Sequence, residues 1–480
     1  MPGREIAFLD QVPAPLREGL AQLRESLGVP DEFDEQVRAE AERAAAGVRL
    51  PERDLTEVPF VTIDPEGSMD LDQALHIGRD DGGYLVRYAI ADVAAFVTPG
   101  GPIDVECHQR VETLYAPTRR TPLHPPVLSE GAASLLPDVV RPALVWEIRL
   151  DASGEPTAST VGRARVRSRR RYSYEEVQRL LDDTTAEDVL VLLAEVGRLR
   201  EAAEAARGGV SLGVPEQEVH VAEDGTWTLE YRTNLPCEGW NAQISLLTGM
   251  VAARIMLDAG VGILRTLPPA EDHAIDRLRR TAQGLGISWK QRVSYPEFVR
   301  SLDAAVPREA AMLNACTTLF RGAGYDAFTD GAPLHGVDHA AIAAPYAHVT
   351  APLRRLVDRY AGEVCVAVCS GQPIPDWVLV ALEELPSEME ASSRRAGRYE
   401  RGIIDLVEAM VLAPGIGHEF TGLLIDVDPE RTAGRLQLRD PAVEARVKGG
   451  RRLRLGAEIT ATLVAADLVN GRVEFRAFAE

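Results

Sequence analysis

Leucines at helical spacing mark the first part of the chain. The four positions recur every three or four residues, the period of one helix face, and are Leu16, Leu20, Leu23 and Leu27. A Gly-Val-Pro sequence at 28–30 is predicted to end this helix, and Asp31 is a candidate N-cap for a second helix that ends near residue 46. Residues 1–50 are therefore expected to form a small helical region, similar to helix-turn-helix pairs, for which we favour packing against the next domain over binding of RNA.

Strand and helix patterns are mixed from residue 51 to about residue 410, which predicts an α+β domain. Strands are predicted at 84–90 and 144–150, and helices at 174–181 and 186–206. The segment 241–259 is apolar on nearly all sides, so it is expected to be a helix buried in this domain.

The last part of the chain, 412–480, has a β pattern. Strands are predicted at 419–425, 435–438, 458–465 and 472–478, with Asn470 and Gly471 as a hairpin turn before the last of them. Four or five short strands in so few residues are typical of an OB barrel. Three phenylalanines of this segment are candidates either for stacking on bases or for the barrel core: Phe420, Phe475 and Phe478.

Composition adds a cellular setting. The chain of 480 residues is long enough for two to four domains. It has no uninterrupted apolar run of about 18 residues and no basic-then-apolar leader, so we expect a cytoplasmic protein that does not enter membranes. The 5 cysteines are scattered and imply no disulfide framework.

Three aspartates lie close together within a largely apolar segment, 60–74. If residues 70–72 are extended, the period-2 rule places Asp70 and Asp72 on one face, and a turn at 65–67 can bring Asp64 beside them. Such carboxylates repel one another unless a cation or shared protons neutralise them, and oxygen ligands favour Mg²⁺ or Mn²⁺. Met69 and Leu71 are expected in the core. The pattern alone leaves an ordinary acidic turn open as the alternative.

The net charge of −21 argues against a nucleic-acid partner only on average, because charges act over about 8 Å at physiological salt. Three basic runs are candidates for a channel that leads to the acidic cluster, although a single run is usually a solvated face. The runs are Arg163, Arg165, Arg167, Arg169, Arg170 and Arg171; Arg394, Arg395, Arg398 and Arg401; and Arg446, Lys448, Arg451, Arg452 and Arg454.

Several ordered motifs resemble the ribonuclease II (RNB) family of 3′→5′ exoribonucleases. They are Thr-Ile-Asp at 62–64 with Asp70 and Asp72, Ala-Ile-Ala-Asp-Val at 89–93, Leu-Tyr-Ala-Pro at 114–117, the segments 127–135 and 346–355, and a last motif near Arg401. The resemblance implies an α+β RNB catalytic domain over 51–410 and a C-terminal S1-type OB domain over 412–480. The family's usual fourth acid is Gln73 here.

The resemblance also implies roles for individual residues. Asp64, Asp70 and Asp72 would hold Mg²⁺ or Mn²⁺, and Asp72 would also position the attacking water. Arg401 would stabilise the transition state, since a guanidinium has a fixed geometry and a permanent charge. Gln73 is expected to leave an active enzyme that needs more divalent ion.

Residues along the substrate path follow from the same resemblance. Tyr115 would stack on the terminal bases and Tyr174 would lie near the sugars, while either tyrosine could instead belong to the core. Arg354 and Arg355 would contact phosphates, and His348 would contact substrate or pack. The expected reaction is processive hydrolysis of single-stranded RNA to nucleoside 5′-monophosphates by a monomer.

Two other functions stay open. Gln73, and Ala344 where the family carries a glutamate, make a catalytically impaired RNA-binding protein on an RNB fold conceivable. The second rival is a metal-dependent DNA exonuclease. Retention of three aspartates with an arginine favours the ribonuclease, because a protein that only binds RNA has no need of that set.

Overall fold

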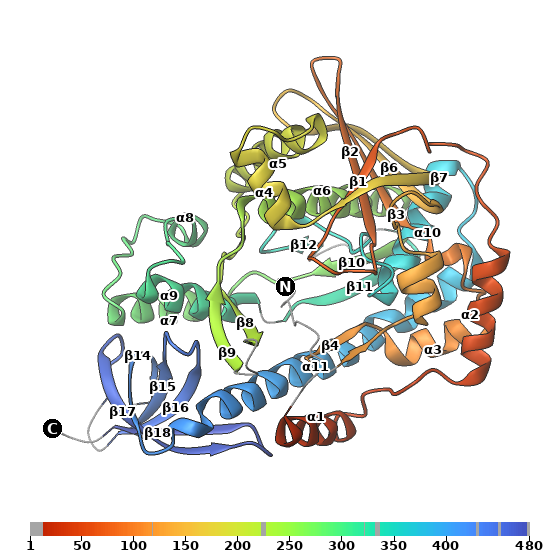
Figure 1. Cartoon of the computed structure of the whole chain (residues 1–480). Helices are drawn as coiled ribbons and strands as arrows, with labels where there is room; N and C mark the ends of the chain where they lie inside the picture. The colour runs from red at the N-terminus through yellow and green to blue at the C-terminus, as the bar shows by residue number, and fades with distance from the viewer. Residues whose placement is uncertain are drawn as a thin grey trace.

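Two closed β-barrels, joined by one long helix and surrounded by shorter helices, make up the protein (Figure 1). The structure is a computed structural model that describes residues 13–117, 119–221, 227–320, 322–331, 337–428, 432–449 and 453–477. The mixed content of helices and strands confirms the predicted α+β class.

The helices that the sequence predicts are present. Those at 174–181, 186–206 and 241–259 are confirmed within a few residues, apart from the start of the last one. The helices are α1 (Ala14–Ser26), α2 (Glu35–Gly47), α3 (Pro102–Arg110), α4 (Tyr174–Asp182), α5 (Asp188–Arg207), α6 (Pro236–Ala259), α7 (Asp272–Gly284), α8 (Tyr295–Arg300), α9 (Pro307–Cys316), α10 (Leu356–Ser370) and α11 (Asp376–Leu412). Helices α3 and α7–α11 were not predicted.

The strands form the two barrels and four small two-stranded sheets. They are β1 (Phe60–Ile63), β2 (Gln73–Asp80), β3 (Gly83–Ala91), β4 (Leu114–Ala116), β5 (Arg119–Thr121), β6 (Val140–Leu150), β7 (Pro156–Tyr172), β8 (Glu216–Val221), β9 (Trp227–Arg232), β10 (Gly262–Thr266), β11 (Gly324–Phe328), β12 (Asp338–His339), β13 (Ala344–Pro345), β14 (Glu419–Asp428), β15 (Ala433–Gln437), β16 (Glu444–Gly449), β17 (Glu458–Asp467) and β18 (Arg472–Ala477).

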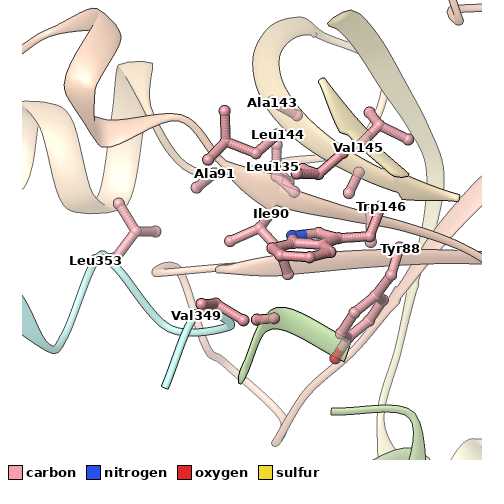
Figure 2. Close-up of a cluster of buried hydrophobic side chains, with 14 of the residues drawn as sticks. Tyr88, Ile90, Ala91, Leu135, Ala143, Leu144, Val145, Trp146, Val349 and Leu353 are labelled. Atoms are coloured by element: carbon pink, nitrogen blue, oxygen red, sulfur yellow. The ribbon is translucent and has the colours of Figure 1, made fainter. Parts of the chain in front are cut away.

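The first barrel has the strand order β1-β2-β3-β6-β7, and parallel pairing of β1 with β7 closes it. Tyr88 of β3 lies opposite Trp146 of β6 in the register, and both side chains are buried. Figure 2 shows Trp146 beside Ile90, with Val349 and Leu353 of a distant segment packed on the same cluster. This apolar cluster thus fixes the segment 349–353 against the barrel wall.

The two N-terminal helices pack on different parts of the protein. Leu16 and Leu20 of α1 share a buried cluster with the end of α11, as Figure 1 shows, where α1 lies beside that helix. Glu40 of α2 accepts a hydrogen bond from the backbone N–H of Ile103 at 2.8 Å. The predicted N-cap Asp31 is wrong, because the side chain of Asp34 accepts the capping bond from the Val37 N–H.

Helix α11 has 37 residues and runs from beside α10 to the second barrel (Figure 1). Its C-terminal turns, including Leu406 and Leu412, share a buried cluster with the C-terminal strands. The chain therefore has no flexible linker at the predicted boundary between residues 410 and 412, since these residues are helical.

The second barrel has the strand order β14-β15-β16-β18-β17. Four of its strands lie where the sequence predicts them, and β16 was not predicted. Phe475 is fully buried and Phe420 packs edge-on against it with ring centroids 5.6 Å apart, so both belong to the core. Phe478 lies outside the described residues.

Helix α6 is the one helix, in the part of the chain that the structure describes, that is long and apolar enough to cross a membrane. Half of its most apolar window is buried inside the structure, and Ile244, Leu247 and Met256 belong to the main core. The helix therefore packs as the predicted core helix.

Candidate active site

The loop between β1 and β2 carries the three aspartates and is pinned at several points. The hydroxyl of Ser134 accepts a bond from the Leu71 N–H at 3.0 Å and donates to the carbonyl of Met69 at 2.6 Å. Leu71 is fully buried, as predicted, whereas Met69 is 39% exposed and the prediction of a core position for it is wrong. Burial of Leu71 turns its two aspartate neighbours toward the same recess.

Asp72 is the most buried of the three acids, with only 5% of its surface exposed. Its Oδ1 accepts a hydrogen bond from the backbone N–H of Leu353 at 2.7 Å, and its Oδ2 lies 3.7 Å from Nε of Arg354. Burial raises the pKa of the Asp72 carboxyl well above its usual range, against the opposing charge of Arg354. The segment 353–354 thus supplies both a donor and a cation to Asp72.

Asp64 follows β1 directly, and its backbone N–H bonds to the carbonyl of Tyr172 at 3.1 Å. Burial and, next, the charge of Asp70 raise the pKa of its carboxyl to about 7, while Arg354 and Arg171 oppose the rise. Buried carboxylates that raise one another's pKa lack a compensating charge, which a cation or a proton would supply.

Asp70 differs from Asp64 and Asp72 because the guanidinium of Arg120 is in direct contact with its carboxylate. Nη1 of Arg120 lies 2.8 Å from its Oδ1, and the hydroxyl of Tyr115 donates to its Oδ2 at 3.4 Å. Tyr115 and Arg120 face each other across the β4–β5 hairpin. Tyr115 therefore lies directly over the acidic cluster.

The donor chemistry of the site fits a hard divalent cation, because all three acids offer carboxylate oxygens. Within the described residues, however, no group of three or more His, Cys, Asp or Glu side chains is placed to hold a metal ion. A site formed by all three aspartates stays a prediction. Asp70 is in direct contact with a guanidinium, that of Arg120 at 2.8 Å, whereas the guanidinium nearest to Asp72 lies 3.7 Å away.

Gln73 does not point an unused amide at the acids. Its Nε2 donates to the carbonyl of Thr350 at 2.6 Å, and its Oε1 accepts from the hydroxyl of Tyr88 at 2.5 Å. Both ends of the amide are thus engaged in holding β2 to β3 and to the segment that precedes Arg354. A role of Gln73 as metal ligand does not fit this bonding.

Tyr174 begins α4, behind an N-cap in which the Ser173 hydroxyl accepts from the Glu176 N–H. Its own hydroxyl accepts from Asn241 of α6 at 3.4 Å. The Asp64 charge adds to burial in raising the pKa of the Tyr174 hydroxyl, which places this tyrosine on the Asp64 side of the site. Tyr115 and Tyr174 thus flank the acids.

Arg355 and His348, which were predicted to contact substrate, form hydrogen bonds with other residues of this chain. Arg355 makes a bidentate pair with Asp358, with bonds of 2.5 and 2.9 Å, and Asp358 is buried. Nδ1 of His348 lies 2.7 Å from the hydroxyl of Tyr325, and its ring packs edge-on against Tyr346. Burial lowers the pKa of His348 well below its usual range, so this histidine is neutral near pH 7.

Arg401 lies on an exposed face of α11, where its Nε donates to the Gly397 carbonyl at 3.0 Å. Within the described residues, no contact joins Arg401 to the three aspartates, and its catalytic role stays a prediction. Arg354 is the arginine that the structure brings to Asp72, and its side chain is 48% exposed, open to a substrate.

The first predicted basic run is largely ion-paired along β7. Five of its six arginines contact carboxylates: Arg163 with Asp92 and Glu363, Arg165 with Asp54, Arg167 and Arg169 with Glu57, and Arg170 with Glu176. Arg171 instead donates to the Ser68 carbonyl at 2.6 Å. The last three arginines of this run, Arg169, Arg170 and Arg171, also line an open hollow of about 580 Å³ beside Met69. The third run is described only in part, because Arg451 and Arg452 lie outside the described residues.

Two residues of the site were missed from sequence. Arg120 follows the Leu-Tyr-Ala-Pro motif closely, and hairpin pairing with Tyr115 was the signal that could have found it. Ser134 lies in the motif 127–135, yet no spacing rule predicts that its hydroxyl would bridge the aspartate loop.

Comparison with known proteins places this geometry in a family. Residues 52–369 match the RNB domain, and residues 418–478 match the RNase II-type exonuclease C-terminal S1 domain. Ribonuclease R of Aquifex aeolicus is 28% identical over 93% of this chain and 68% of its own length.

Two solved structures share the fold. Mycoplasma genitalium RNase R in complex with ribose methylated single-stranded RNA has a TM-score of 0.85 at 19% identity, over 97% of this chain and 78% of that one. Yeast Ssd1, described as a pseudonuclease, has a TM-score of 0.73 at 15% identity, over 93% and 58%. Because the RNB match spans more than half of the sequence and the C-terminal barrel matches the S1 domain, this chain belongs to the RNB family.

Proposed function

We propose that this chain is a 3′→5′ exoribonuclease that hydrolyses single-stranded RNA processively to nucleoside 5′-monophosphates with a divalent metal ion. The observation that carries the proposal is the convergence of Asp64, Asp70 and Asp72 with Arg354 beneath Tyr115. Phosphodiester hydrolysis needs an oriented water and stabilisation of charge on the phosphoryl oxygens.

The chain's own residues fit these tasks. Asp72 is held by the Leu353 N–H, so its free oxygen has a fixed direction toward a water or an ion. Arg354 places a permanent positive charge next to that oxygen, where a phosphoryl group would develop negative charge. Tyr115 offers a ring over the acids on which a terminal base can stack.

Asp64 and Asp72 are the carboxylates that would hold the ion. When bound, Mg²⁺ or Mn²⁺ would lower the pKa of a coordinated water and polarise the phosphoryl group. The similarity to RNase R, whose structure contains single-stranded RNA, supports RNA as the substrate. We further propose that the enzyme works as a monomer in the cytoplasm, where its five free cysteines stay reduced.

The second candidate is an RNA-binding protein without activity. The fold shared with the pseudonuclease Ssd1 favours it, as does Gln73 at a position where the family usually has an acid. The bonding of Gln73 weakens this alternative, because the amide stabilises the start of β2, directly after Asp72, without disturbing the three aspartates.

One gel separates these functions. A 5′-labelled single-stranded RNA and the matching DNA are incubated with the protein, with and without Mg²⁺, alongside the Asp72→Asn variant. The proposal expects that, with metal, only the RNA is converted into a short 5′-labelled limit product with few intermediates, and that the variant leaves it intact. Intact RNA that is shifted on a native gel at every Mg²⁺ and Mn²⁺ concentration would establish the binding protein, and degradation of the DNA would establish the DNA exonuclease.

A further inference from the structure

The short β4–β5 hairpin carries an arginine, Arg120, whose side chain contacts the acidic cluster. Strands β4 and β5 place Tyr115 opposite Arg120, and both side chains reach Asp70. Nη1 of Arg120 lies 2.8 Å from Oδ1 of Asp70 and 3.5 Å from Oε1 of Glu130. Only 17% of the Arg120 side chain and 14% of the Asp70 side chain are exposed, so solvent screens this pair weakly.

The hairpin is anchored on both sides, which fixes the position of Arg120. The backbone N–H of Thr113 bonds to the carbonyl of Arg354 at 2.9 Å, just before β4. After Arg120, the hydroxyl of Thr121 accepts from the guanidinium of Arg24 in α1 at 2.8 Å. The hairpin is thus tied both to the segment that contacts Asp72 and to the N-terminal helix.

The charges around the site limit how many divalent ions it can hold while Arg120 is in place. Four carboxylates, those of the three aspartates and of Glu130, face two guanidiniums, those of Arg120 and Arg354. Two divalent ions in the same recess would leave an excess of positive charge and would be repelled by both arginines. A single ion near Asp64 and Asp72 leaves the site close to neutral.

We propose that Arg120 is a resident cation that takes the place of a second divalent ion at Asp70, so that the site holds one divalent ion. The inference rests on the proposed function only in taking Asp64 and Asp72 as carboxylates that bind a metal. Arg120 is a positioning residue, because it acts through Asp70 and Tyr115.

Counting bound Mn²⁺ tests the proposal. The full chain is titrated with Mn²⁺ while the signal of free Mn²⁺ is followed by electron paramagnetic resonance, without RNA. Wild type is expected to bind one ion tightly, and Asp64→Asn to lose that ion. Arg120→Gln frees the Asp70 carboxylate, so this variant is expected to bind a second ion or to bind Mn²⁺ at least about tenfold more tightly.

Arg119→Gln is the matched control. Arg119 lies next to Arg120 on β5, but its guanidinium faces Asp31 and Glu32 at 3.4 and 3.6 Å on the outside of the hairpin. The control is expected to keep the count and affinity of wild type. Arg120→Lys retains a cation, so it is also expected to keep one ion.

Two tight Mn²⁺ ions in wild type, or no tight ion at all, would overturn the proposal whether or not Arg120→Gln folds. So would an Arg120→Gln chain that is folded by circular dichroism yet binds Mn²⁺ as wild type does. These counts are independent of hydrolysis. A chain that binds one ion but leaves RNA intact refutes the nuclease alone, whereas a chain that degrades RNA with two ions bound refutes the role of Arg120 alone.

Discussion

A buried glutamate where three elements meet allows a quantitative test of the structure. Glu408 of α11 is only 5% exposed. Its Oε1 accepts one bond from Nε2 of Gln217 in β8 at 2.8 Å and another from the backbone N–H of Glu444 in β16 at 3.1 Å. Burial raises the pKa of this carboxyl from 4.5 to about 7, and the charges of Asp405 and Glu444 add to the rise.

The raised pKa of Glu408 makes the free energy of unfolding depend on pH. The folded state holds the proton to a higher pH than the unfolded state, so stability is complete below about pH 4.5 and is lost as the pH rises toward 7. A shift of about 2.5 units at 1.36 kcal/mol per unit corresponds to roughly 3 kcal/mol at pH 8, and to about 1 kcal/mol at pH 5.

Glu408→Gln removes this loss and keeps the contacts, because both hydrogen bonds end on a single oxygen that the amide also provides. We expect the variant to be more stable than wild type by up to about 3 kcal/mol at pH 8, with the difference shrinking below pH 5. Urea unfolding, followed by circular dichroism between pH 5 and pH 8, measures it.

Glu383→Gln, on the exposed part of the same helix, serves as the control and should not reproduce the pH dependence. A Glu408→Gln variant that is less stable than wild type at pH 8 would refute the reasoning. A stability difference that stays constant from pH 5 to pH 8 would refute it as well, because it would come from packing rather than from a proton.

Four further changes test the site. Asp72→Asn should keep RNA affinity but lower turnover by at least about 10³-fold, and turnover within tenfold of wild type in a single-turnover assay would remove it from catalysis. Tyr115→Ala should lengthen the limit product on a poly(A) ladder, since stacking contributes about 1–3 kcal/mol per base; an unchanged product contradicts this. Arg354→Ala should lower kcat by at least ten times more than Arg401→Ala, because only Arg354 reaches Asp72; the reverse order would restore the role predicted for Arg401. Gln73→Asp should destabilise the fold by about 1–3 kcal/mol through the lost bond to Thr350, and a melting temperature equal to that of wild type would argue against a structural amide.

Local pattern was enough to predict the elements whose periodicity or turn signal is strong. Leucine spacing gave α1, the all-round apolar segment gave α6, and the turn at Asn470 and Gly471 gave the last hairpin of the barrel. The N-cap of α2 was wrong because Asp31 and Asp34 are both capping residues by type, and only tertiary contacts select one. Asp31 instead forms ion pairs with Arg24 and Arg119.

Charge patterns were less informative than apolar ones. Arginines alternate with other residues along β7 from Arg163 to Arg169, as expected of a strand with one face exposed, but these arginines pair with carboxylates from distant segments. A sequence shows how many cations lie close together, but it does not show which acids neutralise them. The basic runs thus overstate the positive surface that is available to RNA.

The active-site geometry depends on contacts between segments that are far apart in the chain. The bond from the Leu353 N–H to Asp72 joins positions 281 residues apart, and Gln73 reaches Thr350 over a similar separation. The motifs in the sequence identify both segments but do not show which of their residues meet. The sequence therefore could not show whether Arg354 or Arg401 lies beside Asp72. Because the aspartate loop and the segment 350–354 share these bonds and the apolar cluster of Figure 2, a change in either should alter the position of both. The catalytic geometry is therefore a property of the barrel wall as much as of the acids it carries.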